Sequence, residues 1–294
     1  MRKQKSAPSV ATVATRDPKG LKFISIIESA YNKVGLSDVE AQRVNDTPGL
    51  AELVSTFINE NRSPNEFKDE EVPSTYTYPT NYKIKSIAEQ VKMLHEHFSD
   101  VSWGYFRPDE KAISLPTGAE SLFALPRWEK VASSYNEAVE KVLGLLKQTR
   151  TDSFYNYSEG QLGPERFRQT ERAIGAWKPL GEEQKDYDIL IVNAQFGLRH
   201  RGRPVRRTRE CFFGNEFGLG AFAVGCMLLT HPAREVQWEQ LHIDCAGDEF
   251  KPGGVADFSR APCFCWFGGG LEFDASWCGY ADGRFGSVSG FLPQ

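Results

Sequence analysis

The stretch PCFCWFGGGLEFDASWCGYADGRFGSVSGFLPQ, residues 262–294, decides the fold class of the C-terminal half of this 294-residue chain. Short apolar runs at 263–267, 271–273 and 289–292 predict strands, with turn-forming residues between them. Seven of the 23 residues from Gly268 to Gly290 are glycine, which is typical of tight turns. We therefore expect residues 151–294 to form a loop-rich α+β domain, in which loops carry the binding residues.

The sequence just upstream predicts the remaining elements of that domain. YDILIV at 187–192 is apolar and rich in branched residues, as in a buried strand, and LHIDC at 241–245 alternates like a strand. FGLGAFAVGCMLLT at 217–230 has the length of a helix and is apolar on nearly all sides. Its glycines at 218, 220 and 225 would let another element approach closely.

The sequence pattern of the N-terminal half predicts helices. Residues 1–20 indicate a disordered basic tail, and residues 21–62 a small helical module whose third helix starts near Thr47 and Pro48. Forty residues bury too little apolar surface to stand alone, so this module must dock on the chain or on a partner. Residues 63–84, rich in proline and charge, indicate a linker. We expect residues 85–150 to form a helical segment, with a long helix from about Arg127 to Gln148.

The amino-acid composition limits the classes of protein to which this chain can belong. Hydrophobic residues make up 40% and charged residues 25%, as in a globular protein, and 35 basic against 39 acidic residues give a net charge of −4. Nothing in the sequence predicts a membrane span. The absence of a signal peptide favours the cytoplasm, although display at a surface stays open.

The cysteines lie within the last 84 residues and form no CxxC pair, so free thiols are expected, with bridges or a metal site as alternatives. They are Cys211, Cys226, Cys245, Cys263, Cys265 and Cys278.

The most basic segment spans residues 199–209 and contains six arginines and no acid: Arg199, Arg201, Arg203, Arg206, Arg207 and Arg209. Guanidinium forks suit phosphate, so one interpretation is a contact with nucleic acid. The alternative is neutralisation by acidic residues nearby in sequence, namely Glu182, Glu183, Asp186, Asp188 and Glu210. We favour neutralisation and expect no nucleic-acid partner, because a nucleic-acid binder usually adds exposed aromatics or a basic domain.

A second candidate is the acidic turn at residues 242–249. On a strand, His242 and Asp244 share a face, and the following turn could bring Asp248 and Glu249 beside them, with His231 close in sequence. Such a set could hold a divalent cation or supply an acid–base pair for hydrolysis. No HExxH, GxSxG or P-loop motif is present in the sequence, and no motif predicts a cofactor.

The segment CGYADGRFGSVS, residues 278–289, lacks Lys, Glu, Gln, Met and Trp. Of the twenty residue types, these five are the ones that codons ending in a pyrimidine cannot encode, so every residue of the segment can arise by change at the first two positions of an AAY codon. An aromatic-bearing loop of this kind, between short strands and before a hydrophobic terminal strand, resembles the variable region of the ligand-binding proteins served by diversity-generating retroelements. That resemblance implies a C-type-lectin fold and a diversified binding surface.

A second resemblance covers most of the chain. QFGLRHRGR (195–203), NEFGLGAFAVG (215–225), IDCAGDE (243–249) and SGFLPQ (289–294) resemble an uncharacterised multi-copy family from uncultured small-genome bacteria. The resemblance implies a bacterial origin and related copies that differ around residues 277–286.

The sequence therefore favours a non-enzymatic protein that binds an unknown protein or surface ligand through residues 277–286. We expect Phe273 and Phe291 to be buried beneath that surface. The alternative is a metal-assisted hydrolase or nuclease that uses His231, His242, Asp244, Asp248 and Glu249 together with the arginines. The expected contact residues are Trp277, Cys278, Tyr280, Asp282, Arg284 and Phe285.

Overall fold

The computed structural model describes residues 18–61, 65–102, 104–106, 115–150, 153–234 and 237–293. These residues divide into two units, with the boundary between Glu60 and Asn61. Across this described part of the chain, no helix combines the length and the apolarity that crossing a membrane requires. The basic tail expected at the N-terminus falls mostly outside the described residues.

The N-terminal unit contains three helices, α1 (Pro18–Val34), α2 (Asp38–Asn45) and α3 (Leu50–Asn61). Ser37 begins α2 with a capping box, in which the Glu40 side chain accepts a hydrogen bond from the Ser37 backbone N–H at 2.9 Å. The helical module was thus predicted correctly, but α3 begins at Leu50. The left-handed backbone of Gly49 (φ +85°), where a turn is needed, explains this later start.

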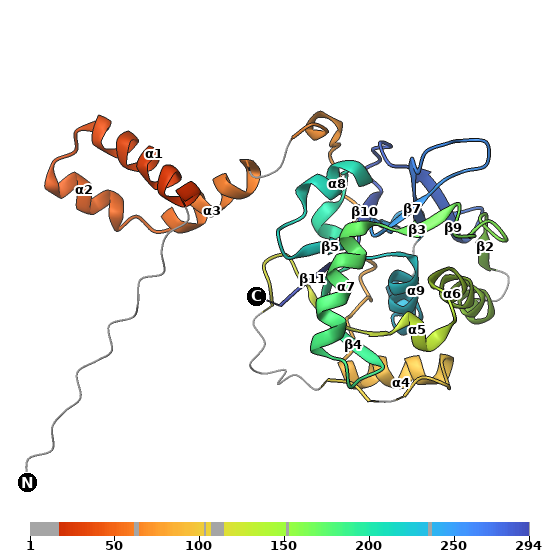
Figure 1. Cartoon of the computed structure of the whole chain (residues 1–294). Helices are drawn as coiled ribbons and strands as arrows, with labels where there is room; N and C mark the ends of the chain where they lie inside the picture. The colour runs from red at the N-terminus through yellow and green to blue at the C-terminus, as the bar shows by residue number, and fades with distance from the viewer. Residues whose placement is uncertain are drawn as a thin grey trace, which may run out of the picture. The chain divides into compact units, whose positions relative to one another are not determined.

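The C-terminal unit is mixed α+β, as predicted, and its described residues form two sheets (Figure 1). The first sheet has the strand order β1-β4-β11-β5, and all its neighbouring strands are antiparallel. These strands are β1 (Ser121–Pro126), β4 (Ile189–Gln195), β11 (Ser289–Phe291) and β5 (Glu216–Gly218). The chain's last strand therefore lies in the middle of this sheet.

The second sheet is built around the antiparallel hairpin of β8 (Arg260–Phe267) and β9 (Gly270–Trp277). Its path runs β10-β6-β8-β7-β3, and β9 joins β8 to β2. The β10–β6 and β2–β9 pairs are parallel. The remaining strands are β2 (Phe154–Asn156), β3 (Phe167–Gln169), β6 (His242–Asp244), β7 (Asp248–Phe250) and β10 (Phe285–Ser287).

Helix α9 (Ala221–Thr230) is buried along its whole length and packs against α4 (Ile87–His97), α6 (Tyr135–Arg150) and β1 (Figure 1). The other helices of this unit are α5 (Trp128–Val131), α7 (Glu171–Glu183) and α8 (Val205–Cys211), with 3₁₀ turns η1 (Lys68–Glu70), η3 (Leu198–His200) and η4 (Pro232–Arg234). One apolar core joins α4, α5, α6, α7 and α9 to both sheets, and α8 packs in a second, smaller cluster.

Residues 85–150, expected to be a helical segment, also contain strand β1, and two expected helices have different bounds. The helix expected from about Arg127 to Gln148 is divided into α5 and α6, because Ala132 is extended and the Ser134 hydroxyl accepts a hydrogen bond from Glu137 N–H at 3.2 Å, which starts a new helix. The apolar helix expected from Phe217 begins at Ala221. The residues before it pair with β11 as strand β5, and the Ala221 N–H donates to the Asp248 carboxylate at 2.6 Å.

Residues 65–84, which the sequence suggested as part of a linker, lie along the C-terminal unit, and we call them the strap. The Val72 N–H donates to Gly202 O at 2.8 Å, and Thr77 O accepts from Leu241 N–H at 3.0 Å. The Ser74 hydroxyl donates to Gly283 O. The strap is therefore fixed by backbone hydrogen bonds to segments that are distant in sequence.

Close packing of α6 against α9 gives a test of the fold. A Cβ atom at Gly225 of α9 would lie 2.2 Å from Val142 Cγ1 of α6, whereas a Cβ at Gly144 of α6 meets nothing within 4 Å. We expect Gly225→Ala to lower the free energy of unfolding by about 1–3 kcal/mol. Gly144→Ala should leave it unchanged or raise it by up to about 1 kcal/mol. Urea unfolding followed by circular dichroism measures both, and equal effects would contradict this packing.

Candidate functional site

The second sheet has one face in the core and one face turned away from it. Ile243, Phe264 and Phe273 lie in register on neighbouring strands and are completely buried. Because side chains alternate along a strand, the residues between them lie on the opposite face, which we call the outer face. Its members in β6, β8 and β9 are His242, Asp244, Cys263, Cys265, Phe267, Glu272, Asp274 and Ser276.

The end of β9, the loop that follows it and the start of β10 carry the expected contact residues, and the Trp277 ring at the end of β9 lies 5.0 Å from the Arg206 guanidinium. Trp277 and Tyr280 are exposed by 54% and 53%, and Asp282, Arg284 and Phe285 are partly buried. Five of the six expected contact residues thus reach the surface of the described chain. We call residues 277–285 the display loop.

Cys278 is the exception, and its placement corrects the expectation that it belongs to the contact surface. Its side chain is only 8% exposed and packs in a small apolar cluster with Val205 and Phe212. The Arg209 guanidinium lies 3.8 Å from its sulfur. Cys278 therefore attaches the display loop to α8.

Arg284 holds the middle of the display loop in place. Its guanidinium forms an ion pair with Asp282 at 2.6 Å, and the Asp282 carboxylate also accepts from the Arg284 backbone N–H at 2.9 Å. Burial raises the pKa of Asp282, but its hydrogen bonds with Arg284 outweigh that effect and lower it. The same guanidinium stacks 4.4 Å above the ring of Trp238.

Trp238 and Phe267 extend the aromatic surface beyond the predicted residues. They are 46% and 60% exposed, and their ring centres lie 6.2 Å apart. Beneath them, the buried His242 ring lies 5.0 Å from the ring of Phe285. Sequence reasoning missed Trp238 because it lies in an irregular segment, where no periodicity assigns it to a face.

The backbone beneath the display loop is held at several points. Cys278 O accepts from the Arg206 N–H at 2.9 Å, and Phe285 O accepts from the Gly202 N–H at 2.9 Å. Phe273 and Phe291 are completely buried, which confirms the prediction that they form the scaffold. Exposed side chains thus project from a backbone that the core and the arginine segment fix.

The arginine segment is neutralised inside the protein, but largely by other acids than those expected. Arg206 pairs with Glu70, and Arg207 pairs with Glu71 at 2.6 Å and with Glu210 at 3.1 Å. Of the expected partners, Glu210 alone forms such a pair among the described residues. Asp188 instead binds Lys130 at 3.2 Å.

The other arginines also bind the protein itself. Arg203 lies 3.3 Å from the Glu71 carboxylate, and Arg199 lies 3.1 Å from Glu216. Arg201 donates to Tyr76 O at 3.0 Å, and Arg209 donates to Ala246 O at 3.0 Å and Asp248 O at 2.8 Å. Most of this charge therefore faces the strap or the interior.

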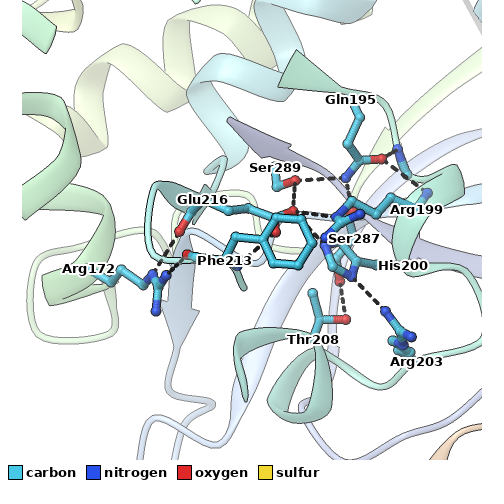
Figure 2. Close-up of polar contacts among 11 residues, drawn as sticks. Arg172, Gln195, Arg199, His200, Arg203, Thr208, Phe213, Glu216, Ser287 and Ser289 are labelled. Atoms are coloured by element: carbon cyan, nitrogen blue, oxygen red, sulfur yellow. Dashed lines mark hydrogen bonds and ion pairs between the residues drawn. The ribbon is translucent and has the colours of Figure 1, made fainter. Parts of the chain in front are cut away.

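Glu216 in β5 is the centre of a buried polar network (Figure 2). Its Oε1 atom accepts from His200 Nε2 at 2.8 Å, Arg199 Nε at 3.1 Å and Ser289 Oγ at 2.7 Å. Its Oε2 atom accepts from the Phe213 N–H at 3.0 Å. The network joins η3, β5 and β11, and Glu216 and His200 are buried.

The network also fixes the protonation of His200. The Arg203 guanidinium lies 3.3 Å from His200 Nδ1 and can only donate, so Nδ1 accepts and Nε2 carries the proton given to Glu216. Burial lowers the pKa of His200, although Glu216 opposes the shift. Burial alone would raise the pKa of Glu216, but His200 and Arg199 outweigh it and lower that pKa to about 2.

The acidic turn does not assemble into one site. His242 and Asp244 share a face of β6, as expected, whereas Asp248 accepts from the Tyr135 hydroxyl at 2.9 Å and from Ala221 N–H in the interior. Burial raises the pKa of Asp244 and of Asp248 to about 7. Glu249 pairs with Arg168 at 2.9 Å on the surface.

His231 is also occupied in the core, where its Nε2 accepts from the Lys85 N–H at 3.1 Å and its Nδ1 lies 3.2 Å from Met227 O. The described residues contain no group of three or more potential metal ligands. All six cysteines lie in described segments and are free thiols, and Cys211 and Cys265 are partly exposed.

Comparison of the chain with protein-family models, with curated proteins and with solved structures finds no match. The resemblance to the variable proteins of diversity-generating retroelements, and the C-type-lectin fold that it implies, therefore stay predictions.

Neutralising Glu216 should destabilise the protein at neutral pH. Glu216→Gln leaves Arg199 without its carboxylate, so we expect the free energy of unfolding to fall by about 2–4 kcal/mol at pH 7. Glu183→Gln, at an exposed position, should change it by less than about 0.5 kcal/mol. Because the Glu216 pKa is lowered from 4.5 to about 2, its contribution is present above pH 4.5 and is lost as the pH falls from 4.5 toward 2. Urea titrations at several pH values should show this loss in the native protein and not in Glu216→Gln.

The strap should suppress binding of nucleic acid. In a fluorescence titration with a random oligonucleotide at about 150 mM salt, we expect feeble binding by the native protein, because its arginines are already paired. Glu70→Gln with Glu71→Gln should strengthen binding in a salt-dependent way, since it frees the charge of Arg206 and Arg207. Sub-micromolar binding by the native protein that Arg206→Ala with Arg207→Ala abolishes would contradict this prediction.

Proposed function

We propose that this protein binds another macromolecule through the display loop and the adjoining aromatic residues Trp238 and Phe267, without catalysing a reaction. The observation that carries the proposal is that exposed aromatic side chains adjoin the Arg284–Asp282 pair: the Trp238 ring lies 4.4 Å from the Arg284 guanidinium and 6.2 Å from the Phe267 ring, and the Tyr280 hydroxyl lies 3.4 Å from Asp282. Single exposed apolar residues are ordinary, whereas a group of them on one surface marks an interaction site.

The residue types suit recognition of a protein or another surface ligand. Trp and Tyr offer large contact areas and few rotatable bonds, so they lose little entropy when they are immobilised. Arginine adds directed hydrogen bonds and stacks on aromatic rings, and these three types are enriched among the residues that dominate binding energy. We infer that Trp277, Tyr280 and Trp238 anchor the ligand and that Arg284 orients it.

The display loop combines exposed side chains with buried ones, as a variable surface on a constant scaffold requires. Trp277 and Tyr280 are about half exposed, with contacts to Arg206 and Asp282 respectively, while Phe273, Cys278 and Phe291 are buried. Substitution of the exposed side chains should therefore leave the scaffold intact. Together with the composition of residues 278–289, this supports a role as a diversified binding protein of the retroelement type.

The hydrolase alternative has weaker support. His231 and Asp248 are bound to core groups, Glu249 is paired with arginines, and His242 lies beneath aromatic rings. Metal-assisted hydrolysis needs several such groups to converge on one point. Among the described residues no group of three or more potential metal ligands converges in this way, which favours the binding proposal.

Matched substitutions test the proposed division between scaffold and contact surface. Trp277→Ser with Tyr280→Ser should lower the melting temperature by no more than about 2 °C, whereas Phe273→Ser with Phe291→Ser should lower it by more than about 10 °C or prevent folding. A library randomised at Trp277, Tyr280, Asp282, Arg284 and Phe285 should yield folded members that bind streptavidin after selection. Equal loss of stability in both pairs would mean that the display loop is only part of the fold.

Sequencing of the genomic locus tests the diversification itself. We expect a reverse transcriptase gene and a near-copy of the last hundred or so bases of this gene, with adenines at the codons for residues 278–285 of the display loop. A locus without either would overturn the retroelement role and leave a fixed binding surface, which the substitutions above still test.

A further inference from the structure

The N-terminal unit has no buried side chain among its described residues 20–58. Its three helices instead expose large apolar residues, each by at least 39%. They include Leu21, Ile24, Ile26, Ile27, Val34, Val39, Val44, Leu50, Leu53 and Ile58. Helices of 17, 8 and 12 residues are marginal in water unless an apolar face is covered.

The exposed area is of the size that proteins use for association. Ten aliphatic side chains about half exposed present on the order of 800 Å² of apolar surface, similar to one side of a standard protein–protein interface. Monomeric proteins rarely expose that much apolar surface in so short a segment. The unit therefore needs an occupant for this surface.

The described chain offers one surface of matching character, which is the same unit in another copy. In the C-terminal unit, exposed large apolar residues are mostly isolated, as at Ile174 and Val255, or belong to the aromatic outer face. Aliphatic helix faces that lack a core suit one another, because each can supply the core that the other lacks.

The distribution of charged side chains also favours a second copy of the N-terminal unit as the occupant. Among the described side chains, α1 carries Lys22 and Lys33 against Glu28 and is net basic, whereas α2 carries Asp38 and Glu40 against Arg43 and α3 carries Glu52, so both are net acidic. A surface with a basic helix and acidic helices can meet its own copy with opposite charges facing, as a twofold interface requires. We propose that the N-terminal units of two or more copies associate through their apolar faces and make the protein a homo-oligomer.

Association through the N-terminal units would place several display loops in one homo-oligomer. If the proposed binding role holds, a ligand with repeated epitopes would be held by several copies at once, which raises the apparent affinity without any new contact. The association itself does not depend on that role, so it can be tested without a ligand.

The first test measures the mass of the full chain by analytical ultracentrifugation from about 1 to 100 µM. We expect a mass of at least two chains in the native protein and of one chain in Ile27→Gln with Leu53→Gln, which replaces apolar contacts with residues that favour helices. Ile174→Gln, at an exposed apolar position on α7, should keep the native mass. Because the helices are marginal when their apolar faces are uncovered, circular dichroism should show less helix in Ile27→Gln with Leu53→Gln than in Ile174→Gln.

The second test exchanges charges. Lys22→Glu with Lys33→Glu, and separately Asp38→Lys with Glu52→Lys, should each weaken self-association at least tenfold, and mixing the two variants should restore a complex. Restoration by mixing cannot result from misfolding of either variant.

Two outcomes overturn the proposal. One is a native protein that stays a single chain over the whole concentration range, and co-sedimentation with anionic vesicles would then distinguish a lipid surface from the chain's own C-terminal unit as the occupant. The other is a native oligomer whose mass Ile27→Gln with Leu53→Gln leaves unchanged, because another surface must then hold the copies together.

Discussion

The buried carboxylate of Glu216 is the interaction on which the C-terminal unit depends. A charge without access to water is tolerated only when donors surround it, and here the donors come from η3, from β11 and from the residues before β5. This requirement fixes the arginine segment against the first sheet. The arginine segment in turn holds the strap through Glu70 and Glu71 and contacts the display loop at Cys278. A single anion thus connects the sheet interior to the outer surface.

The sequence predicted the helices and strands whose apolar residues follow a regular local pattern. Helical periodicity revealed the helical module and α4, and the branched run at 187–192 revealed β4. The division between α5 and α6 was missed because apolar spacing continues across Ser133 and Ser134, although the serine cap starts a new helix. Strand β5 was missed because its apolar residues run into α9 without a polar break. The strap was interpreted as a linker because its hydrogen-bond partners, such as Gly202 and Gly283, lie more than a hundred positions away.

The candidate site was predicted only in part, because some of its contacts join segments that are distant in sequence. A loop between two strands is visible in the sequence, and so are the residues it exposes, which is how Trp277, Tyr280 and Arg284 were found. Cys278 could not be recognised as buried, because its apolar neighbours come from α8 and β8. Trp238 became part of the surface through its contact with Arg284, which only tertiary structure brings about. The compensation of the arginines was foreseen, but the strap supplied acids that sequence proximity did not suggest.

The strap also determines how the protein responds to force. It covalently joins the N-terminal unit to the C-terminal unit, so tension between an anchored N-terminal unit and a ligand on the display loop passes along residues 65–84. Its bonds to Gly202, Gly283 and Leu241 are spaced along an extended backbone and would open one after another when the strap is pulled from its N-terminal end. Full release would add about 65 Å of chain before the core carried any load. The strap is thus an extensible tether, and because Ser74 binds Gly283 of the display loop, pulling the strap away would also remove one support of the binding surface.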